Sequence, residues 1–480
     1  PLRYDYPIMT PLTNYIVYQG FFIPIEWSKF LIRNYLNYPT GYLEIPKDNT
    51  KFHDFFYRVV LGDRWINALF WGRYVTALVG VLVVLITFLI TRRLYSTKAG
   101  LLSAFFVAIN YRHVLNSHLG LPDIYNSFFL LLSFWFTINV FEKPTNKNYF
   151  WSAIFAGISF STKYQFFAFT PLLIVHLINS FKEKNFKNKI RFLFKPMAIM
   201  IPVIIAVLFV ILNPYHLIKL DETRTWLSSV SGKYRTGRMI FDFYPYSYLY
   251  HIGIGKLVSI LSLLGVFVAF HYKKLNTALL LSVILPFLFI TTYYTGGGFY
   301  TRNFVTIIPF LLIFAGVLLS KLSKYKGLLF VLLIIVSRES LSNSLIILKE
   351  YIRPWNYKVM QTWTNKNVND DMVVAAHASV PLPDTIKKVI PYNFVTEDFS
   401  MREFGEKGAD LVISNLDWST TDFYGWMTQD TKNSFKYWNK PLNLLESSYA
   451  GMSLREFSDY STFSVVKFWQ APDTNYIVAK

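Results

Sequence analysis

Residues 66–93 have the sequence INALFWGRYVTALVGVLVVLITFLITRR, an apolar run with a single charge, Arg73, before it ends in Arg92 and Arg93. A helix needs roughly 20 mostly apolar residues to cross a bilayer. This run is long enough, and two arginines at its end are typical of the cytoplasmic side of a span. The stretch therefore predicts a membrane-spanning helix over residues 66–91.

Apolar runs of this kind recur along the chain. We expect about ten spans, of which 99–111, 149–161 and 327–337 are short for a full crossing. Residues 8–24 are also apolar, but their prolines and aromatic residues favour a helix in the outer membrane interface. The fold class predicted from these runs is a polytopic α-helical membrane protein. The other spans are predicted at 66–91, 121–141, 164–181, 193–213, 251–271, 276–292 and 304–320.

Composition supports this class and excludes others. Of the 480 residues, 53% are hydrophobic and only 16% are charged, against about 25% charged in an average soluble domain. Lys and Arg number 48 and Asp and Glu 29, which leaves a net charge of +19. In a membrane protein such an excess lies on one side of the bilayer, so we expect no nucleic-acid partner. The absence of cysteine excludes disulfides, thiolate nucleophiles and Cys-ligated zinc.

The connections between the predicted spans alternate in charge. Every second connection is short and basic, and the positive-inside rule places these in the cytoplasm. The opposite side then holds residues 1–65, the turn 112–120, the loops 214–250 and 293–303, and the C-terminal region. We therefore expect a multi-pass plasma-membrane protein whose active site and C-terminal domain are extracytoplasmic. The basic connections contain Arg92, Arg93 and Lys98; Lys143 and Lys147; Lys182, Lys184, Lys187, Lys189 and Arg191; Lys273 and Lys274; and Lys321, Lys324 and Lys326.

Three regions follow from this pattern. Residues 1–65 are predicted to be a first outer loop with interfacial helices, 66–349 a transmembrane domain and 350–480 a soluble α/β domain. About 130 residues suffice for one small domain with its own core. Strands are predicted in this last region at Met372–Ala376, Asp410–Ser414, Ser461–Trp469 and Asn475–Ala479.

Asp123 lies where the span 121–141 begins, directly after Pro122. One interpretation is a carboxylate that satisfies free backbone N–H groups at the start of a helix. The other is a functional carboxylate that deprotonates or positions an acceptor, or that holds a divalent metal, because ionisable residues at the edge of a span are often functional. The residue alone fits both interpretations.

Three cations occupy comparable positions. Lys163 lies in a turn between two spans, where it reaches either lipid headgroups or a lipid-linked phosphate. Arg302 follows three glycines at 296–298, in a loop suited to an anion, or else anchors the next span. Arg73 lies about two turns into the first span and would pair with an acid or a phosphate. Each has a plain structural explanation beside the functional one.

The long loop 214–250 carries charges of both signs among many tyrosines. Such a mixture is typical of a sugar site, and equally of any solvated interfacial loop; Arg224 and Arg238 are its substrate-binding candidates. The histidines lack His-x-x-x-His spacing, and neither a Gly-x-Ser-x-Gly nor a Gly-x-Gly-x-x-Gly motif occurs. The sequence therefore gives no support to a zinc hydrolase, a serine hydrolase or a nucleotide-dependent enzyme.

Five stretches occur in a recognisable order. They are YDYPIMTPL at 4–12, the arginine-led span with its basic turn at 72–95, the acidic loop and helix start at 113–132, SFSTKY at 159–164, and Arg302 before a Pro-containing span. In this order they resemble the polytopic GT-C glycosyltransferases of glycosyltransferase family 39, which include aminoarabinose-transferase-like enzymes and protein O-mannosyltransferases. The segment 4–12 looks like the Tyr-Pro-Pro-Leu segment of that family's first outer loop.

The resemblance implies the inverting transfer of a sugar from a polyprenyl-phosphate carrier to a hydroxyl of a lipid, glycan or protein acceptor, amid membrane lipids. Such chemistry needs a carboxylate to take the acceptor proton and cations to stabilise the leaving phosphate. Asp123 suits the first role, and Lys163, Arg302 and Arg73 suit the second. The sequence identifies no certain cofactor, and a divalent metal stays open.

The same resemblance concerns the N-terminal loop. In this family the principal carboxylate usually lies in an Asp-Glu pair upstream of the Tyr-Pro-Pro-Leu segment, so we expect one further span carrying that pair before Pro1. Asp5 is then a second catalytic candidate, and Tyr4 and His118 are further substrate-binding candidates. Two other functions stay open: a lipid or sugar transporter (flippase), and a catalytically incomplete glycan-binding membrane subunit.

Overall fold

A computed structural model describes residues 16–37, 65–225, 228, 244–294 and 301–352. Beyond these it describes residues 368–369, 371–377, 386, 388–392, 407–414, 464–469 and 477–479. The chain divides into two units. The first comprises Pro1–Val230, Tyr246–Ile290 and Thr301–Ser344, and the second comprises Ser231–Pro245, Thr291–Tyr300 and Leu345–Lys480. The domain boundaries predicted at 65 and 349 stay a prediction.

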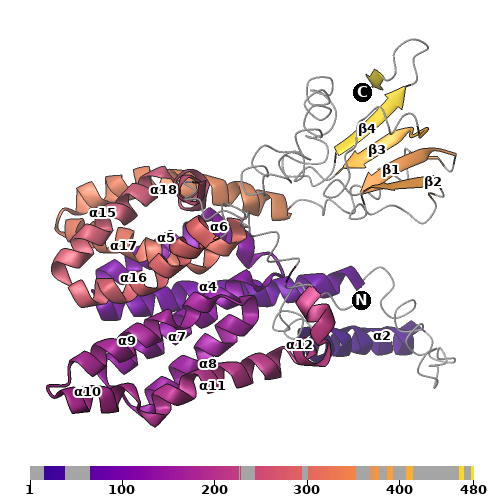
Figure 1. Ribbon diagram of the computed structural model, residues 1–480. Coiled ribbons are helices and arrows are strands. Elements are labelled where there is room, and N and C mark those ends of the chain that lie inside the picture. The colour runs from indigo at the N-terminus through magenta and orange to yellow at the C-terminus, as the bar shows by residue number, and fades with distance from the viewer. Residues whose placement is uncertain are drawn as a thin grey trace. The chain divides into compact units, whose positions relative to one another are not determined.

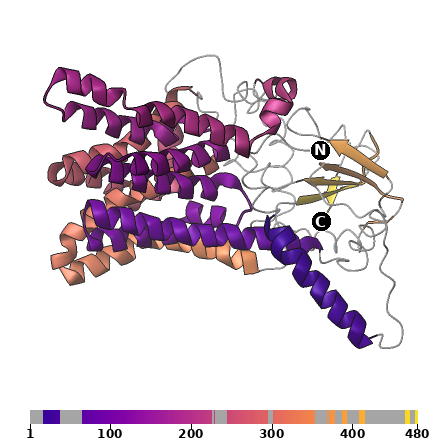
Figure 2. The ribbon, with the colours of Figure 1, turned by 90° about the horizontal axis from the view of Figure 1, so that it is seen from below.

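The first unit is built from long helices that run side by side (Figure 1). Seen from below, they share a common direction (Figure 2). The main helices are α4 (Trp65–Leu94), α5 (Thr97–Ile109), α6 (Tyr111–Ser117), α7 (Pro122–Glu142), α8 (Asn146–Lys163), α9 (Thr170–Phe181), α10 (Phe186–Leu193), α11 (Pro196–Leu212), α12 (Tyr215–Ile218), α15 (Lys256–Tyr272), α16 (Lys274–Phe289), α17 (Ile308–Lys321) and α18 (Lys326–Ile352). Shorter elements are η1 (Tyr18–Phe22), α2 (Ile23–Asn37), η4 (Phe166–Phe169), α14 (Tyr244–Tyr248), η5 (Leu249–Gly253), η6 (Ile290–Tyr294), η7 (Thr301–Thr306) and η8 (Leu322–Lys324).

Several of these helices are long and apolar enough to cross a membrane. Within the described residues, five stretches qualify: Trp71–Leu94, Pro122–Glu142, Phe186–Leu212, Lys274–Tyr293 and Lys326–Leu345. Each apolar run predicted from the sequence falls on helices of the chain. The prediction of a polytopic α-helical membrane protein is confirmed. Of the predicted interfacial segment 8–24, residues 16–24 are helical and residues 8–15 lie outside the described ones.

Glycines allow the helices to approach one another closely. A methyl group added to Gly316 of α17 would lie 2.1 Å from Ser103 Oγ of α5, and one added to Gly265 of α15 would lie 2.1 Å from the carbonyl oxygen of Phe314. Gly157 of α8 meets α11 in the same way. Lipid tails are as apolar as leucine side chains, so close packing of this kind is a main source of helix association in membranes.

The basic connections meet at one end of this helical unit, as the charge pattern predicts. Arg93, in the last turn of α4, pairs with Glu142 at the end of α7, with Nη2 and Oε2 2.7 Å apart. Further hydrogen bonds join Tyr95 to Thr277, Lys98 to Ser323 and Lys182 to Phe141. The assignment of this end to the cytoplasm is a proposal.

Helix α18 is longer than predicted. Its apolar run was expected to end at residue 337, because Arg338 and Glu339 interrupt it, but the helix continues to Ile352. Glu339 Oε2 accepts a hydrogen bond of 3.0 Å from the backbone N–H of Lys256, the first residue of α15. A carboxylate there satisfies a free N–H group and complements the helix dipole. Glu339 therefore caps a neighbouring helix, and the polar pair does not end its own helix.

The predicted turn at 112–120 is also wrong, because residues 111–117 form the helix α6. Asn110 caps it: its side-chain oxygen accepts a 3.0 Å hydrogen bond from the backbone N–H of His113. His113, Asn116 and Ser117 are buried. A short helix with a buried face thus leads into the start of α7.

The described part of the second unit contains a five-stranded sheet with the order β2-β1-β3-β4-β5. β1 (Val373–His377) pairs in parallel with β2 (Lys388–Tyr392) and β3 (Leu411–Ser414). β4 (Ser464–Trp469) runs antiparallel to both β3 and β5 (Ile477–Ala479). The four predicted strands are confirmed, and β2 was missed because Lys388 and Pro391 interrupt its apolar pattern.

Candidate active site

The start of α7 carries the carboxylate around which the site is built. Pro122 is the first residue of the helix, and the side chain of Asp123 is 0% exposed. Its Oδ1 accepts a hydrogen bond from Lys163 Nζ, whereas Oδ2 is buried without a hydrogen-bond partner among the described residues. These are the contacts of an ion pair and not of a helix cap. An unsatisfied buried acceptor costs about 1–3 kcal/mol, so a bound group that donates to Oδ2 recovers that cost.

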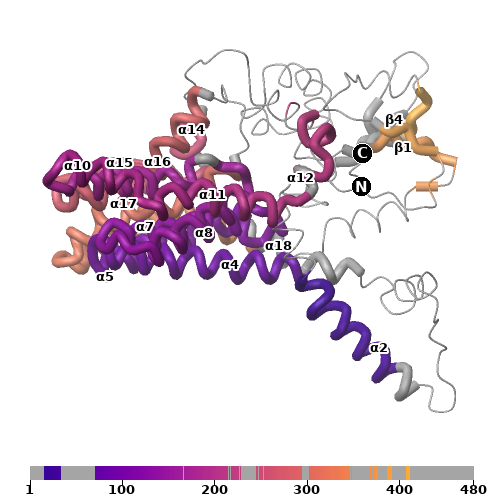
Figure 3. The backbone as a smooth tube through the Cα atoms, turned by 60° about the horizontal axis from the view of Figure 1, so that its bottom comes forward, coloured from indigo at the N-terminus to yellow at the C-terminus, as the bar shows by residue number. Residues whose placement is uncertain are grey.

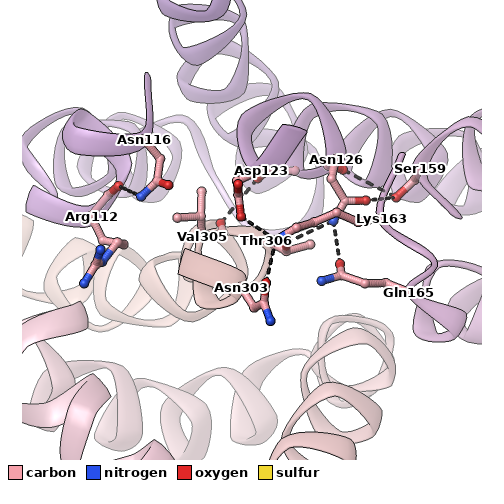
Figure 4. Close-up of polar contacts among 11 residues, drawn as sticks. Arg112, Asn116, Asp123, Asn126, Ser159, Lys163, Gln165, Asn303, Val305 and Thr306 are labelled. Carbon is pink, nitrogen blue, oxygen red and sulfur yellow. Dashed lines mark hydrogen bonds and ion pairs between the residues drawn. The ribbon is translucent and has the colours of Figure 1, made fainter. Parts of the chain in front are cut away.

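Lys163 is the last residue of α8 and joins three segments of the chain. Its Nζ donates to Asp123 on α7 and, at 2.5 Å, to Asn303 Oδ1 on η7. The lysine side chain is 11% exposed, so the pair is largely withdrawn from water. The structure brings these two sequence candidates into direct contact (Figure 4).

A polar network lies one turn along α7 from the ion pair (Figure 4). Asn126 Nδ2 donates to Gln165 Oε1 at 2.5 Å and to Thr306 Oγ1 at 3.0 Å. Asn126 Oδ1 accepts from Ser159 Oγ at 2.8 Å. These bonds connect α7, α8 and η7, the same three segments that meet at the ion pair. Hydrogen bonds of this kind hold the side chains of a site in one geometry.

Two more cations lie close to the pair. Arg302 precedes Asn303 on η7, and its charge acts on Lys163. Arg112 of α6 acts in turn on Asp123. Three cations around one carboxylate give the site an excess of positive charge, which suits a phosphate group.

Arg112 is the member of this set that sequence reasoning missed. Its guanidinium carbon lies 5.4 Å from the ring centres of both Tyr111 and Tyr248, and its Nε is buried without a hydrogen-bond partner among the described residues. Burial opposes its charge, but Tyr248, Tyr111 and Asp123 together raise the pKa of Arg112 above its ordinary value. The available signal was Asn110, a helix-capping residue type directly before Tyr111.

The other described candidates lie on separate elements. Arg73 is on α4, one turn before Thr76, whose Oγ1 lies 3.3 Å from the hydroxyl of Tyr125 on α7. Arg73 is therefore near the end of the unit that holds Asp123. His118 follows α6, and its Nδ1 lies 2.8 Å from the carbonyl oxygen of Val114 in that helix.

The candidates from the long loop and the N-terminus are not brought to the ion pair by any described contact. Arg224 is exposed, and its Nη1 lies 3.9 Å from Asp221 Oδ1. Tyr4, Asp5 and Arg238 lie outside the described residues. The roles of all these candidates stay predictions.

An apolar groove lies between α8, α9 and α11 and has a volume of about 440 Å³. Phe160 of α8, three residues before Lys163, lines one part of it, so the groove lies one turn from the ion pair. α11 forms the opposite wall, and its Val203 and Val207 are 47% and 50% exposed on the surface of the unit. The lining residues are Phe160, Phe169, Leu173, Ile201, Pro202, Ile205, Ala206, Phe209 and Val210.

Metal ligands do not gather at this site in the part of the chain that the structure describes. No group of three or more His, Cys, Asp or Glu side chains there is placed to hold a metal ion. The described residues thus offer no ligand set for the divalent metal that the sequence left open.

Comparisons with known proteins bear on this arrangement. Residues 66–229 match the family model of dolichyl-phosphate-mannose-protein mannosyltransferases. No curated protein matches the sequence. The matched residues run from α4 to just beyond α12 and include Arg112, Asp123 and Lys163. The resemblance to the GT-C family that the sequence motifs predict is confirmed over this region.

Solved membrane-protein structures give distant likenesses. The chain is similar to ArnT from Cupriavidus metallidurans bound to undecaprenyl phosphate, with 16% identity, a TM-score of 0.44 and coverage of 69% of this chain and 53% of that one. Its likeness to the apo state of ArnT has 16% identity, a TM-score of 0.40 and coverage of 58% and 51%. The archaeal oligosaccharyltransferase AglB from Archaeoglobus fulgidus, in complex with an inhibitory peptide and a dolichol-phosphate, gives 14% identity, a TM-score of 0.40 and coverage of 86% and 65%. The chain thus spans about half the length of the ArnT structures.

Proposed function

We propose that this chain, whose residues 66–229 match a GT-C membrane glycosyltransferase family, transfers a sugar from a polyprenyl-phosphate carrier to an acceptor hydroxyl, with inversion at the anomeric carbon. One observation carries the proposal. A buried carboxylate, Asp123, is paired through one oxygen with Lys163, while its other oxygen has no partner among the described residues. The available oxygen is the proton acceptor that the reaction needs.

Asp123 acts in this proposal as the general base. The acceptor hydroxyl donates to Asp123 Oδ2 and gives up its proton as its oxygen attacks the anomeric carbon. Lys163 holds the other carboxylate oxygen and stabilises its negative charge. Positioned acid–base groups contribute about 10²- to 10⁴-fold to a rate. Asp5 is the second candidate for this role within the chain.

The cations near Asp123 act on the leaving group, the lipid phosphate. As the bond from sugar to phosphate breaks, charge accumulates on the leaving lipid phosphate, and preorganised cations stabilise it most at that point. Lys163 contacts the carboxylate, Arg112 interacts with it electrostatically, and the charge of Arg302 acts on Lys163, so these three cations are the candidates for this role. Arginine forms two parallel hydrogen bonds with a phosphate, which also fixes the orientation of the donor.

The lipid tail of the donor is accommodated in the groove between α8, α9 and α11. The groove is lined by apolar side chains, lies at the surface of the unit and reaches within one turn of Lys163. A polyprenyl chain bound there has its phosphate beside the cations while its tail stays among apolar groups.

The proposal is tested with the full-length protein in liposomes and a radiolabelled polyprenyl-phosphate sugar. We expect the label to move to an acceptor hydroxyl with the opposite anomeric configuration. If the lipid-linked sugar instead crosses the bilayer without transfer, the protein is a transporter. If it is bound and neither moved nor transferred, the protein is a glycan-binding subunit.

A further inference from the structure

Helix α8 ends in an unusual backbone conformation directly after Lys163. Tyr164 has φ 55° and ψ 31°, in the left-handed region. Among the described residues it is the one non-glycine residue with a positive φ. The left-handed conformation costs a residue with a side chain roughly 1–2 kcal/mol. Strain of this kind persists where surrounding contacts hold it in place.

Two hydrogen bonds from the corner between α11 and α12, together with ring packing against Phe209 of α11, hold this turn. The hydroxyl of Tyr164 lies 2.8 Å from His216 Nε2, and both rings pack with Phe209, at centroid distances of 5.7 and 5.6 Å. Asn213 Nδ2 donates to the carbonyl oxygen of Ser161 at 3.3 Å. The corner therefore holds the chain on both sides of Lys163. In Figure 3, α11 runs from α10 at one end to α12 at the other.

We propose that Tyr164 and His216 form a latch that positions Lys163 for catalysis. Lys163 Nζ donates to Asp123 on α7 and to Asn303 on η7. It reaches both acceptors only when the end of α8 holds the lysine backbone in one position. The last turn of α8 determines that place, and the latch fixes the turn. A displacement of about 1 Å in a site lowers a rate by up to about 10²-fold. Tyr164 and His216 are positioning residues, since they act through the lysine.

The chain offers a matched control on the same helix. The hydroxyl of Tyr149 lies 2.8 Å from His176 Nδ1, and both residues are buried. This second Tyr–His pair is at the other end of α8, roughly 21 Å along the helix from Lys163. A loss of helix stability alone affects both pairs alike, whereas a loss of lysine position affects only the Tyr164 pair.

The kinetic test rests on the proposed function and uses the full-length protein in liposomes. We expect Tyr164→Phe and His216→Ala each to lower kcat about tenfold and to change KM less than twofold. The double variant falls no further, because both changes break one bond. His216→Gln recovers most of kcat, since its amide oxygen accepts from the tyrosine hydroxyl. Tyr149→Phe keeps wild-type kcat per folded protein. Equal losses in Tyr164→Phe and Tyr149→Phe, or no loss in Tyr164→Phe, would overturn the latch.

A second readout needs no sugar donor. The rate at which a small amine-reactive reagent modifies Lys163 is measured by mass spectrometry in the same variants. We expect Tyr164→Phe to raise this rate severalfold and Tyr149→Phe to leave it unchanged, because the released lysine spends time away from Asp123. An unchanged rate in Tyr164→Phe overturns the latch whatever the activity. If the rate rises but wild-type protein transfers no sugar, the latch stands and the proposed function fails.

Discussion

Asp123 is buried and Lys163 is largely withdrawn from water, although each alone would be costly to withdraw. Their mutual attraction offsets part of that cost, and removing one member of such a pair costs about 3–5 kcal/mol. Buried ion pairs are therefore poor stabilisers compared with apolar packing. The other oxygen of Asp123 has no hydrogen-bond partner among the described residues, which supports a role of this pair in chemistry over one in folding.

The first prediction concerns this carboxylate. Asp123→Asn keeps the size of the side chain and an oxygen that accepts from Lys163, but it removes the base. We expect sugar transfer to fall by about 10²- to 10⁴-fold in kcat. The measurement is transfer of radiolabelled sugar by purified, reconstituted protein.

Asp221→Asn is the matched control for that change. Asp221 is fully exposed, and its contact with Arg224 is a loose 3.9 Å. We expect wild-type transfer from this variant. Equal activity in Asp123→Asn and Asp221→Asn would remove Asp123 from the mechanism.

At the residue scale, the sequence was informative where a charge stands alone at the end of a span. Asp123, Lys163 and Arg302 were found in this way, and the structure places them together. Arg112 was missed, because residues 112–120 gave no apolar period by which to recognise a helix. Asn303 and Asn126 carry no charge, so only their contacts with the ion pair or its neighbours identify them.

At the scale of helices, the contact between α5 and α17 depends on a missing side chain. A methyl group on Gly316 would lie 2.1 Å from Ser103 Oγ and 2.8 Å from the carbonyl oxygen of Ala99. We expect Gly316→Ala to lower stability by about 1–3 kcal/mol, because backbone cannot move aside easily. Thermal unfolding of the purified protein in detergent measures the effect.

Gly327→Ala is the control for helix propensity. A methyl group there has no heavy atom of the described residues within 4 Å, and alanine favours a helix over glycine by up to about 1 kcal/mol. Its unfolding temperature should match or exceed that of the wild type. A Gly316→Ala protein as stable as Gly327→Ala would show that α5 and α17 do not pack as described.

Helix α6 gives a prediction about pH. Burial lowers the pKa of His113 to about 4, whereas an unfolded histidine titrates near pH 6.5. As pH falls below 6.5, the unfolded chain takes up a proton that the folded chain does not. Stability is therefore lost between pH 6.5 and about 4, by a total on the order of 3 kcal/mol from this group.

The measurement is the unfolding temperature between pH 7 and 4.5. His113→Gln should lose less stability over this range than the wild type, whereas His271→Gln, at an exposed position, should follow the wild type. A His113→Gln protein that loses as much stability as the wild type would contradict the buried, neutral histidine.

At the element scale, the sequence predicted which helices and strands exist better than it predicted where each of them ends. Apolar runs located the long helices because a helix that crosses lipid needs apolar side chains along its length. The end of α18 was placed too early because Glu339 interrupts the apolar run. Its carboxylate accepts a hydrogen bond from the first residue of α15, so it does not mark the end of α18. β2 was missed because Pro391 lies within it, a residue that disrupts the strand pattern used to find β1 and β3.

At the scale of the whole molecule, the charge pattern of the sequence predicted an arrangement that pairwise contacts reproduce. Basic connections such as those at Arg93 and Lys98 meet at one end of the helical unit. The ion pair lies where α8 and α11 have their C-terminal ends, with α12 beside it. The charge pattern could not predict the shape of the pocket, because the shape depends on how far each helix is shifted along its axis relative to its neighbours.

The measurement that tests the account most directly is the side of the membrane on which the ion-pair end lies. Since these 480 residues contain no cysteine, each single-cysteine variant adds one thiol to them, and its modification is read on the purified protein. Asp221→Cys marks the end near the ion pair and Lys184→Cys marks the basic end, both at exposed positions. On intact cells, a membrane-impermeant thiol reagent should modify Asp221→Cys at once and Lys184→Cys only after permeabilisation. The reverse pattern would place the reaction centre in the cytoplasm and contradict the account.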